Sequence, residues 1–341
     1  MWSSVCPERG TETRIAFWST CKRGTGVSTY DYADYIEQLG MKVMILCSDT
    51  NLGDTALHVA SLKRFRSRFS DVVVLPRWQE MARNQEARAE LDNVLKHFNA
   101  TDLYVQKTGV KDKMHSKLPC VRNLIHCVFD ASHPHGTRYA RISASVPGKN
   151  VPILPLMVRD GIVVGPDLRS ELEIPSEATV LGSYGGAKSF NIGFVKEVID
   201  EVLLLRSDVY FVFLNHNKFG LRHHRKIFLP SSVDETKKKA FIRTCDAMLH
   251  ARREGETYGL AVAEFSMHNK PIITSSVHHD HNRARMHIDT LKERGVYYHN
   301  KDSLRYVINN FNRTQARLGD WKAYKAYSPL YVTERFLDVF G

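Results

Sequence analysis

The chain has 341 residues, of which 43% are hydrophobic, and it carries a formal net charge of +11 at pH 7. This composition excludes a disordered tail and a fibrous repeat, and the length predicts about two globular domains. The positive charge is spread over both halves of the sequence. It therefore fits nucleic acid, an anionic membrane surface or phosphorylated small molecules as partners, but not a basic arm.

The sequence predicts a cytoplasmic protein that lies at most peripherally on a membrane surface. No apolar run approaches the ~18 residues of a membrane span, and the first residues lack an apolar leader. The six cysteines form no C-x-x-C pair and no zinc spacing. We therefore expect all six to be reduced.

Short apolar runs alternate with helical patterns along the first half of the chain. Helices are predicted over 29–39, ending at the C-cap Gly40, and over 80–98. Strands are predicted at 14–19, 42–47, 71–75, 102–106 and 123–129. This alternation indicates a parallel sheet with helices on both faces.

The segment 146–175 contains five of the twelve prolines and is predicted to be a domain linker. The alternation then restarts, with strands at 179–183, 209–214, 226–229, 247–250 and 271–275, and helices over 192–205, 234–243 and 259–268. The segment from Leu304 looks helical, with a break around Ser328-Pro329.

This pattern predicts an α/β fold of two tandem, Rossmann-like, doubly wound domains that face each other across a cleft. We expect an N-terminal domain over 1–158 and a C-terminal domain over 159–324, with a final helix at about 325–341 that packs back on the first domain. Such folds bind ligands at the turns that follow their strands.

The first such turn, 20–28, contains Gly24 and Gly26 between a predicted strand and a predicted helix. Glycines let a ligand approach the backbone closely, and a helix start favours an anion. The turn lacks the third glycine of the dinucleotide fingerprint. A plain tight turn and a phosphate loop both stay open.

The second turn, 182–189, is one residue short of a P-loop and has Ala187 in place of the last glycine. A Cβ at that position would crowd a backbone that wraps phosphates, so a true P-loop is not favoured. Lys188 is expected to neutralise a diphosphate admitted by the preceding glycines. The alternative is a solvated lysine.

The third turn follows the predicted strand 247–250 and leads into a helix that opens around Tyr258-Gly259. The amides of Gly259 and Leu260 at its start suit a diphosphate. Glu256 and Glu264 flank that position, and carboxylates accept sugar hydroxyls well. The alternative is an N-capping glutamate and a surface glutamate.

The stretch from Glu256 to Glu264, Glu-Thr-Tyr-Gly-Leu-Ala-Val-Ala-Glu, resembles the E-x(7)-E region of family-four retaining glycosyltransferases of the GT-B fold. The resemblance is specific over about 240–276 and architectural elsewhere. Arg252-Arg253 stands where that family usually has Pro-Ser, and Asn269 replaces a glycine. The family's arginine before Lys188 is absent, so the diphosphate is expected to draw a charge from Arg253 instead.

The resemblance implies that Glu264 holds the ribose of a nucleotide-diphosphate sugar and that Glu256 contacts the transferred sugar. The helix start at Tyr258, Gly259 and Leu260 would hold the diphosphate. Lys188 would assist there, and the loop with Gly24 and Gly26 would approach the donor. No D-x-D motif is present, so neither a metal nor another cofactor is expected.

The remaining candidate lies directly after the strand 123–129, in Asp130-Ala-Ser-His-Pro-His135. Family enzymes often carry a histidine there, so His133 is the first choice for a catalytic residue beside Glu256, with His135 second. A loop histidine bonded to backbone is the alternative. The run 278–281, His-His-Asp-His, does not complete a zinc ligand set.

The sequence thus predicts a metal-independent retaining glycosyltransferase with a nucleotide sugar as donor and a glycan or glycolipid as acceptor. Nucleic acid is not expected as a partner, whereas peripheral contact with an anionic membrane is compatible with this function. The alternatives are a nucleotide-sugar epimerase or hydrolase on the same fold, and a basic protein that binds nucleic acid or a membrane surface.

Overall fold

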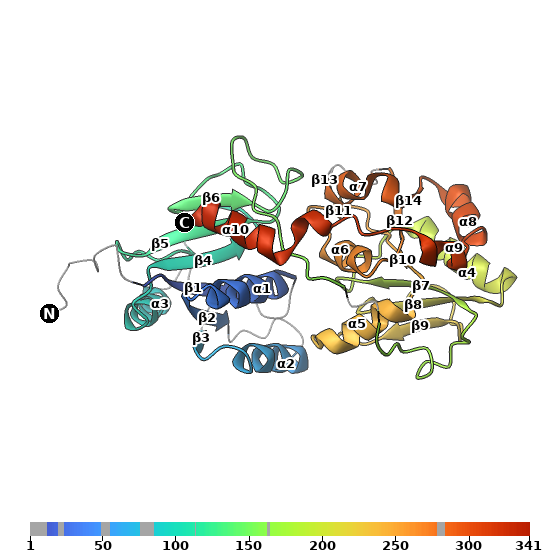
Figure 1. Cartoon of the computed structure of the whole chain (residues 1–341), viewed down its shortest axis with the longest axis horizontal. Coiled ribbons are helices and arrows are strands. Elements are labelled where there is room, and N and C mark those ends of the chain that lie inside the picture. The colour runs from blue at the N-terminus through green and yellow to red at the C-terminus, as the bar shows by residue number, and fades with distance from the viewer. Residues whose placement is uncertain are drawn as a thin grey trace. The chain divides into compact units, whose positions relative to one another are not determined.

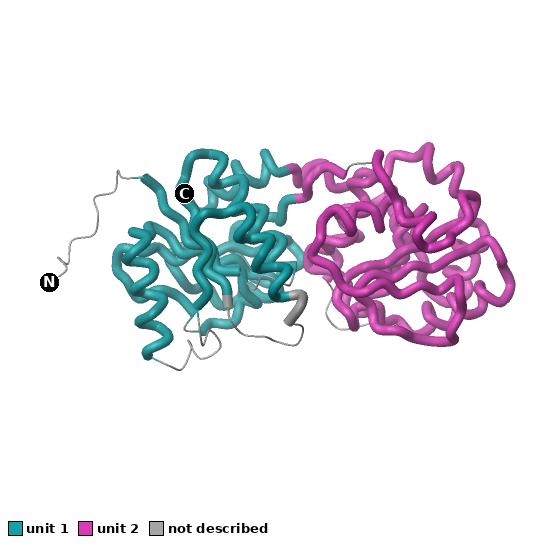
Figure 2. The backbone as a smooth tube through the Cα atoms, turned by 90° about the horizontal axis from the view of Figure 1, so that it is seen from below, with its two compact units in different colours: residues 1–157, 329–341 teal, residues 158–328 magenta. Residues whose placement is uncertain are grey.

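The computed structural model describes residues 12–19, 24–48, 55–75, 85–112, 114–161, 164–277 and 284–341. The chain divides into two compact units (Figure 2). Unit 1 is Met1–Met157 with Pro329–Gly341, and unit 2 is Val158–Ser328. Each contains a six-stranded parallel sheet, and helices cover the sheets (Figure 1).

The sheet of unit 1 has the order β3-β2-β1-β4-β5-β6. The chain starts in the middle, winds outward to β3 and returns to the other side of β1, so the winding reverses between β1 and β4. The strands are β1 (Arg14–Ser19), β2 (Lys42–Ser48), β3 (Val72–Leu75), β4 (Asp102–Lys107), β5 (Arg122–Cys127) and β6 (Arg138–Arg141). The helices of its first segment are α1 (Gly24–Gln38), α2 (Thr55–Arg66) and α3 (Gln85–His97).

The five strands predicted for this half are confirmed within one or two residues, because their apolar runs are buried on both faces of the sheet. The sequence pattern missed α2 and β6. It was also wrong about the second half of the turn 20–28, since α1 begins at Gly24 and includes Gly26. Gly40 has the predicted positive φ of 88° just beyond α1.

The last helix, α10 (Pro329–Phe340), belongs to unit 1 and follows the predicted break at Ser328-Pro329. Its Phe336 ring packs 5.4 Å from that of Tyr32 and 5.7 Å from that of Tyr104. Tyr104 in turn bonds the buried His126, whose other ring nitrogen lies 2.8 Å from the carbonyl oxygen of Leu154. The C-terminal helix therefore completes the aromatic core of unit 1.

Unit 2 has the sheet order β14-β12-β10-β7-β8-β9, and a small ladder pairs β11 with β13. Its strands are β7 (Thr179–Tyr184), β8 (Val209–Leu214), β9 (Lys226–Leu229), β10 (Ala247–Leu249), β11 (Gly255–Glu256), β12 (Ile272–Ser275), β13 (Ala284–Arg285) and β14 (Gly295–Tyr298). Its helices are α4 (Gly193–Leu205), α5 (Glu235–Thr244), α6 (Leu260–Met267), α7 (Met286–Leu291), α8 (Lys301–Asn309) and α9 (Arg313–Leu318), with short 3-10 turns η2 (Lys292–Arg294) and η3 (Lys325–Tyr327).

The winding of this second sheet reverses between β7 and β10. Polar side chains gather at the carboxyl ends of the strands around that point, where α/β sheets bind ligands. Ser183 is the last residue but one of β7, His216 follows β8, His250 follows β10 and Thr274 lies near the end of β12; all four are buried. This edge positions the candidate site.

The expectation that all six cysteines are reduced is wrong for Cys120. This residue is disulfide-bonded, whereas Cys47, Cys127 and Cys245 are buried thiols. Cys120 lies half-buried in the turn before β5 rather than inside an apolar element. No helix among the residues that the structure describes combines the length and hydropathy required to cross a bilayer.

Candidate functional site

The candidate site begins where β10 ends, at His250. Its Nδ1 lies 2.8 Å from the hydroxyl of Thr274, and its Nε2 lies 3.3 Å from Glu256 Oε1. The ring of His287 from α7 packs edge-on against His250 at a centroid distance of 4.9 Å. His250 thereby connects two neighbouring strands of the sheet to the carboxylate of Glu256.

Glu256 is a half-buried carboxylate that is bonded by a histidine and an arginine. Oε1 faces His250, and Oε2 accepts a hydrogen bond of 2.9 Å from Arg252. Burial opposes ionisation, but the hydrogen bond with His250 and the charge of Arg252 outweigh it and lower the pKa of Glu256 to about 2. The side chain is therefore an anion at neutral pH and acts there only as a hydrogen-bond acceptor.

Two glycines shape the backbone on either side of Glu256. Gly255 has φ of 67°, and a Cβ there would lie 2.1 Å from the carbonyl oxygen of Ala284 in the partner strand. Gly259 has φ of 82°, and a Cβ there would lie 3.1 Å from Cγ of Glu256. The left-handed backbone at Gly259 turns the chain from the loop into α6 directly beside the carboxylate.

Helix α6 starts at Leu260 with Gly259 as its N-cap, one to two residues later than predicted. In the described part of the chain no side chain caps this end. The first-turn amides of an α-helix have no intrahelical acceptor, so the positive end of the helix dipole is available to an anion here. The ring of Tyr258 is buried against Tyr324 and Tyr327, so a ligand would meet only the Tyr258 backbone.

Glu264 lies one turn into α6 and bonds a lysine from another helix. Its Oε1 accepts from Lys238 Nζ on α5 at 2.7 Å, and Lys238 also reaches Glu235 at 3.0 Å. The side chain of Lys238 is 12% exposed. Lys238 therefore ties α5 to the middle of α6.

The turn that bears Lys188 lies between β7 and α4 and accepts hydrogen bonds from the loop after β8. Asn215, at φ of 62°, donates from its amide to the carbonyl oxygen of Gly185 at 2.7 Å, and the backbone of Asn217 donates to that of Ala187 at 2.9 Å. The Lys188 side chain is exposed. The glycine turn is thus fixed while its lysine extends into solvent.

Asn191 joins this glycine turn to the loop that carries Glu256. Its side-chain oxygen accepts from the backbone of Arg253 at 2.7 Å, and its amide donates to Glu254 at 2.9 Å. The side chain of Arg253 is exposed, whereas Arg252 reaches Glu256. Asn191, just after the Lys188 turn, is therefore tied to the loop that carries Glu256 within unit 2.

The far end of α6 explains one departure from the family pattern. Asn269 has φ of 57°, a conformation that glycine or asparagine adopts after a helix. Its side chain donates to the carbonyl oxygen of Gly319 at 2.9 Å and accepts from the backbone of Trp321 at 2.9 Å. A glycine would allow the turn but would not make these two bonds.

The predicted residues of unit 1 lie at the start of α1 and in the loop after β5. Gly24 is exposed and Gly26 is buried in the first turn of α1. The side chain of His133 is 69% exposed and lies 4.0 Å from Asp130. His135 is half-buried, its Nδ1 bonds the His133 carbonyl oxygen at 2.8 Å, and its ring packs against Tyr139.

Three residues at the site escaped the sequence argument: His250, Arg252 and Lys238. His250 had a detectable signal, since it directly follows a predicted strand at the carboxyl edge. Lys238 had none, because its partner Glu264 is 26 residues away on a different helix. Among the described residues no group of three or more His, Cys, Asp or Glu side chains is arranged to hold a metal ion, and the run 278–281 lies outside them.

Comparison with solved structures identifies the fold. HepE from Anabaena, solved with UDP-glucose, matches with a TM-score of 0.69 at 10% identity, over 96% of this chain and 99% of that chain. A glycosyltransferase from Rickettsia africae matches at 0.65 and 12% identity, over 96% and 98%. A putative UDP-N-acetylglucosamine 2-epimerase from Listeria monocytogenes matches at 0.54 and 11% identity, over 96% and 95%.

These likenesses confirm the predicted α/β fold of two tandem Rossmann-like domains, the GT-B fold. No family model matches the chain, and no curated protein matches it by sequence.

Proposed function

We propose that this protein is a glycosyltransferase that moves a sugar from a nucleotide-diphosphate sugar to a hydroxyl group of a glycan or glycolipid. The observation that carries the proposal is the uncapped start of α6 beside the ionised Glu256, on a GT-B fold. HepE, which has the same fold, was solved with UDP-glucose. UDP-glucose is therefore the first donor to test.

The diphosphate would lie at the start of α6. The amides of Gly259 and Leu260 point from the positive end of the helix dipole, and Lys188 extends from the fixed glycine turn nearby. Donors held in place before the reaction stabilise the charge that develops on a leaving diphosphate. This arrangement supports departure of the diphosphate without a metal ion.

Glu256 would hold hydroxyls of the transferred sugar. A carboxylate offers about four lone-pair positions, and His250 and Arg252 occupy two of them in the structure. Glu264 would bond the ribose through the acceptor capacity left beside Lys238. With Glu256 just before α6 and Glu264 one turn into it, the diphosphate would lie between two hydroxyl-rich groups.

We propose that the transfer retains the anomeric configuration. The bond from the anomeric carbon to the diphosphate oxygen breaks, and a bond to the acceptor oxygen forms on the same face. The acceptor proton then passes to the departing diphosphate oxygen. A carboxylate whose pKa is about 2 is too weak a base for this role, which argues that Glu256 positions the sugar. His133 or His135 would contact the donor sugar from unit 1.

A thermal-shift panel of UDP-, GDP-, ADP- and dTDP-sugars, with and without EDTA, identifies the donor. With that donor, Glu256→Gln and Lys188→Ala are each expected to lower transfer about 100-fold or more while the fold is kept. Glu171→Gln, at an exposed position in the same unit, is the control. Full activity in both site variants would refute the assignment, and dependence on a divalent ion would refute the metal-independent mechanism.

The likeness to a putative epimerase supports a second candidate function on the same fold, a nucleotide-sugar epimerase or hydrolase. Incubation with the donor alone separates the two functions. Rapid isomerisation or hydrolysis without an acceptor favours the second, whereas an acceptor-dependent product favours transfer.

A further inference from the structure

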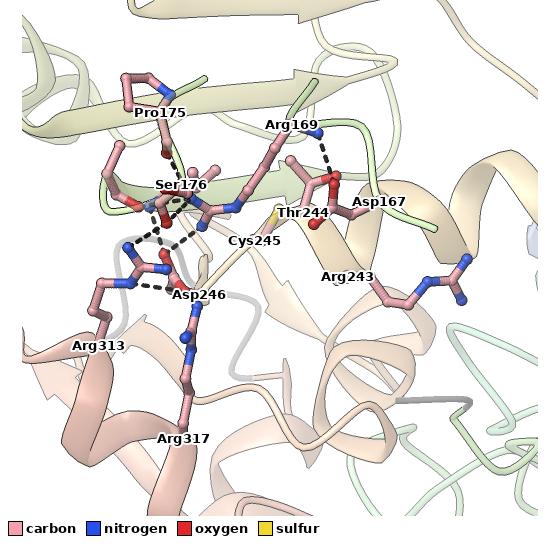
Figure 3. Close-up of polar contacts among 12 residues, drawn as sticks. Asp167, Arg169, Pro175, Ser176, Arg243, Thr244, Cys245, Asp246, Arg313 and Arg317 are labelled. Carbon is pink, nitrogen blue, oxygen red and sulfur yellow. Dashed lines mark hydrogen bonds and ion pairs between the residues drawn. The ribbon is translucent and has the colours of Figure 1, made fainter. Parts of the chain in front are cut away.

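A second cluster of charged residues lies at the opposite end of β10 from Glu256 (Figure 3). We call it the amino-edge cluster; it consists of Asp246, Arg169, Lys270, Arg313 and Arg317. Asp246 is the residue immediately before β10, and its side chain is 3% exposed. The cluster is therefore separated from the candidate donor site by the length of the strand.

Asp246 is bonded on both carboxylate oxygens. Oδ2 accepts from Arg169 at 2.8 Å and from the backbone of Val180 at 2.9 Å. Oδ1 lies 3.4 Å from Nη2 of Arg317 and 3.6 Å from Nε of Arg313. Figure 3 shows the three guanidinium groups converging on this one carboxylate, two of them from α9.

Backbone carbonyls hold two of the arginines in place. Arg169 donates to the carbonyl oxygens of Ala178 at 2.9 Å and of Pro175 at 3.2 Å, and Arg313 donates to that of Ser176 at 2.7 Å. The side chains of Arg169 and Arg313 are 12% and 16% exposed. Their guanidinium groups are thus fixed and largely desolvated before any ligand arrives.

The protein groups of the cluster do not balance its charge. Among the described residues, three arginines face the buried carboxylate of Asp246, with Lys270 in electrostatic range, and Glu177, the second carboxylate near Arg313, is exposed. Nε of Arg313 is buried without a hydrogen-bond partner among the described residues. Lys270 donates only a long bond of 3.4 Å to the carbonyl oxygen of Arg243 within that part of the chain.

The pKa values of two cations in the cluster are also lowered. Burial lowers the pKa of Lys270 and of Arg313, and the neighbouring arginines lower both further. On the exposed faces of α4 and α8, by contrast, hydrogen bonds with carboxylates raise the pKa values of Lys301 and Arg305. A buried surplus of positive charge is costly unless an anion offsets it.

We propose that the amino-edge cluster binds a phosphate group or a similar multivalent oxyanion. Arg313 and Arg317 form its main contacts, with planar guanidinium groups that suit phosphate oxygens. The side chain of Arg317 is 62% exposed, so the site opens to solvent on that side. The anion is either free phosphate or the phosphate of a lipid headgroup, and the proposal stands independently of the proposed function.

The test is thermal unfolding of the full chain in sodium phosphate against sodium chloride of equal ionic strength, with UDP present in both to fill the candidate donor site. Phosphate at about 20 mM is expected to raise the Tm by about 3 °C, saturably. Arg317→Ala is expected to abolish most of this phosphate-dependent shift. Arg294→Ala, which removes another exposed arginine paired with Asp320, is expected to keep it.

The readout is the difference between phosphate and chloride for each variant, so a lower starting Tm of Arg317→Ala does not affect it. Flotation with phosphatidylcholine vesicles that contain phosphatidic acid then separates the two sources. Arg317-dependent flotation assigns the site to a lipid headgroup, and a phosphate shift without flotation assigns it to free phosphate. The proposal is overturned if phosphate acts no differently from chloride and vesicles do not bind, or if Arg317→Ala responds like the native chain.

Discussion

Asp246 and Glu256 are carboxylates next to arginine on either side of the same central strand, β10. Asp246 directly precedes β10, and Glu256, on β11, bonds His250, which directly follows β10. They differ in how their acceptor capacity is used. Asp246 has a hydrogen-bond donor or a cation at both carboxylate oxygens and is 3% exposed, whereas Glu256 is bonded by His250 and Arg252 and is 16% exposed. The two carboxylates therefore differ in burial and in the number of partners.

The difference follows from what each carboxylate connects. Asp246 joins the segment that enters unit 2, through Arg169, to α9 near its end, through Arg313 and Arg317. In the part of the chain that the structure describes, the side chain of Glu256 is hydrogen-bonded by His250 and Arg252, which lie four to six residues away in its own loop. Loss of Asp246 thus affects three distant parts of unit 2, and loss of Glu256 affects one loop.

The largest effect is expected for Asp246→Ala. The change leaves Arg169 without its carboxylate partner and the backbone amide of Val180 without an acceptor, so the free energy of unfolding should fall by about 3–5 kcal/mol. Urea unfolding of the full chain measures it. Asp208→Ala removes an exposed carboxylate that pairs with Arg206 and should cost about 1 kcal/mol or less. Equal effects of the two substitutions would contradict the comparison.

The next largest effect is expected in the pH dependence of the free energy of unfolding, through Glu256. Its pKa of about 2 lies below the ordinary value of 4.5, so its ionised form adds stability that is complete above pH 4.5 and is lost as the pH falls toward 2. At neutral pH this amounts to about 2–3 kcal/mol as an order of magnitude. Glu256→Gln should therefore be less stable than the native chain at pH 7, with a gap that narrows below pH 4.5.

The measurement is the difference in unfolding free energy between the two proteins from pH 7 to about pH 3.5. Glu171→Gln alters an exposed side chain that bonds no residue of the described structure, and this variant is expected to show no such narrowing. A gap between native chain and Glu256→Gln that stays constant over this range would mean that His250 and Arg252 do not stabilise the charge of Glu256.

The same contrast shows what the sequence could predict. The parallel strands were predictable because their continuous apolar runs are buried on both faces, and Glu256 and Gly259 because a short contiguous motif carries them. The two-residue strands β11 and β13 were not, since they carry no periodicity. Asp246 was passed over for a related reason: its partners lie 66 to 77 residues away, and a single carboxylate before a strand has no pattern.

The structure also bears on one departure from the family pattern, the pair Arg252-Arg253. The sequence argument proposed Arg253 as the extra charge, because it occupies the unusual pair with Arg252. In the structure the Arg252 side chain turns to Glu256, and the Arg253 side chain is exposed. Neighbouring residues in a loop point in different directions, and only the fold determines which one faces the carboxylate.

The smallest effect on stability is expected at the C-terminal end of α6. There the side chain of Asn269 uses both its donor and its acceptor, as Asp246 uses both of its oxygens. Asn269→Gly keeps the left-handed backbone but removes the side-chain bonds to Gly319 and Trp321, so we expect a loss of about 1 kcal/mol. Asn99 is the matched control, because it has φ of 54° after α3 and its exposed side chain makes no recorded bond within the described structure. Asn99→Gly should be neutral or slightly stabilising, since glycine relieves the positive φ there. If both substitutions changed the Tm in the same direction and by the same amount, backbone conformation rather than the side-chain bonds of Asn269 would explain the asparagine at the end of α6.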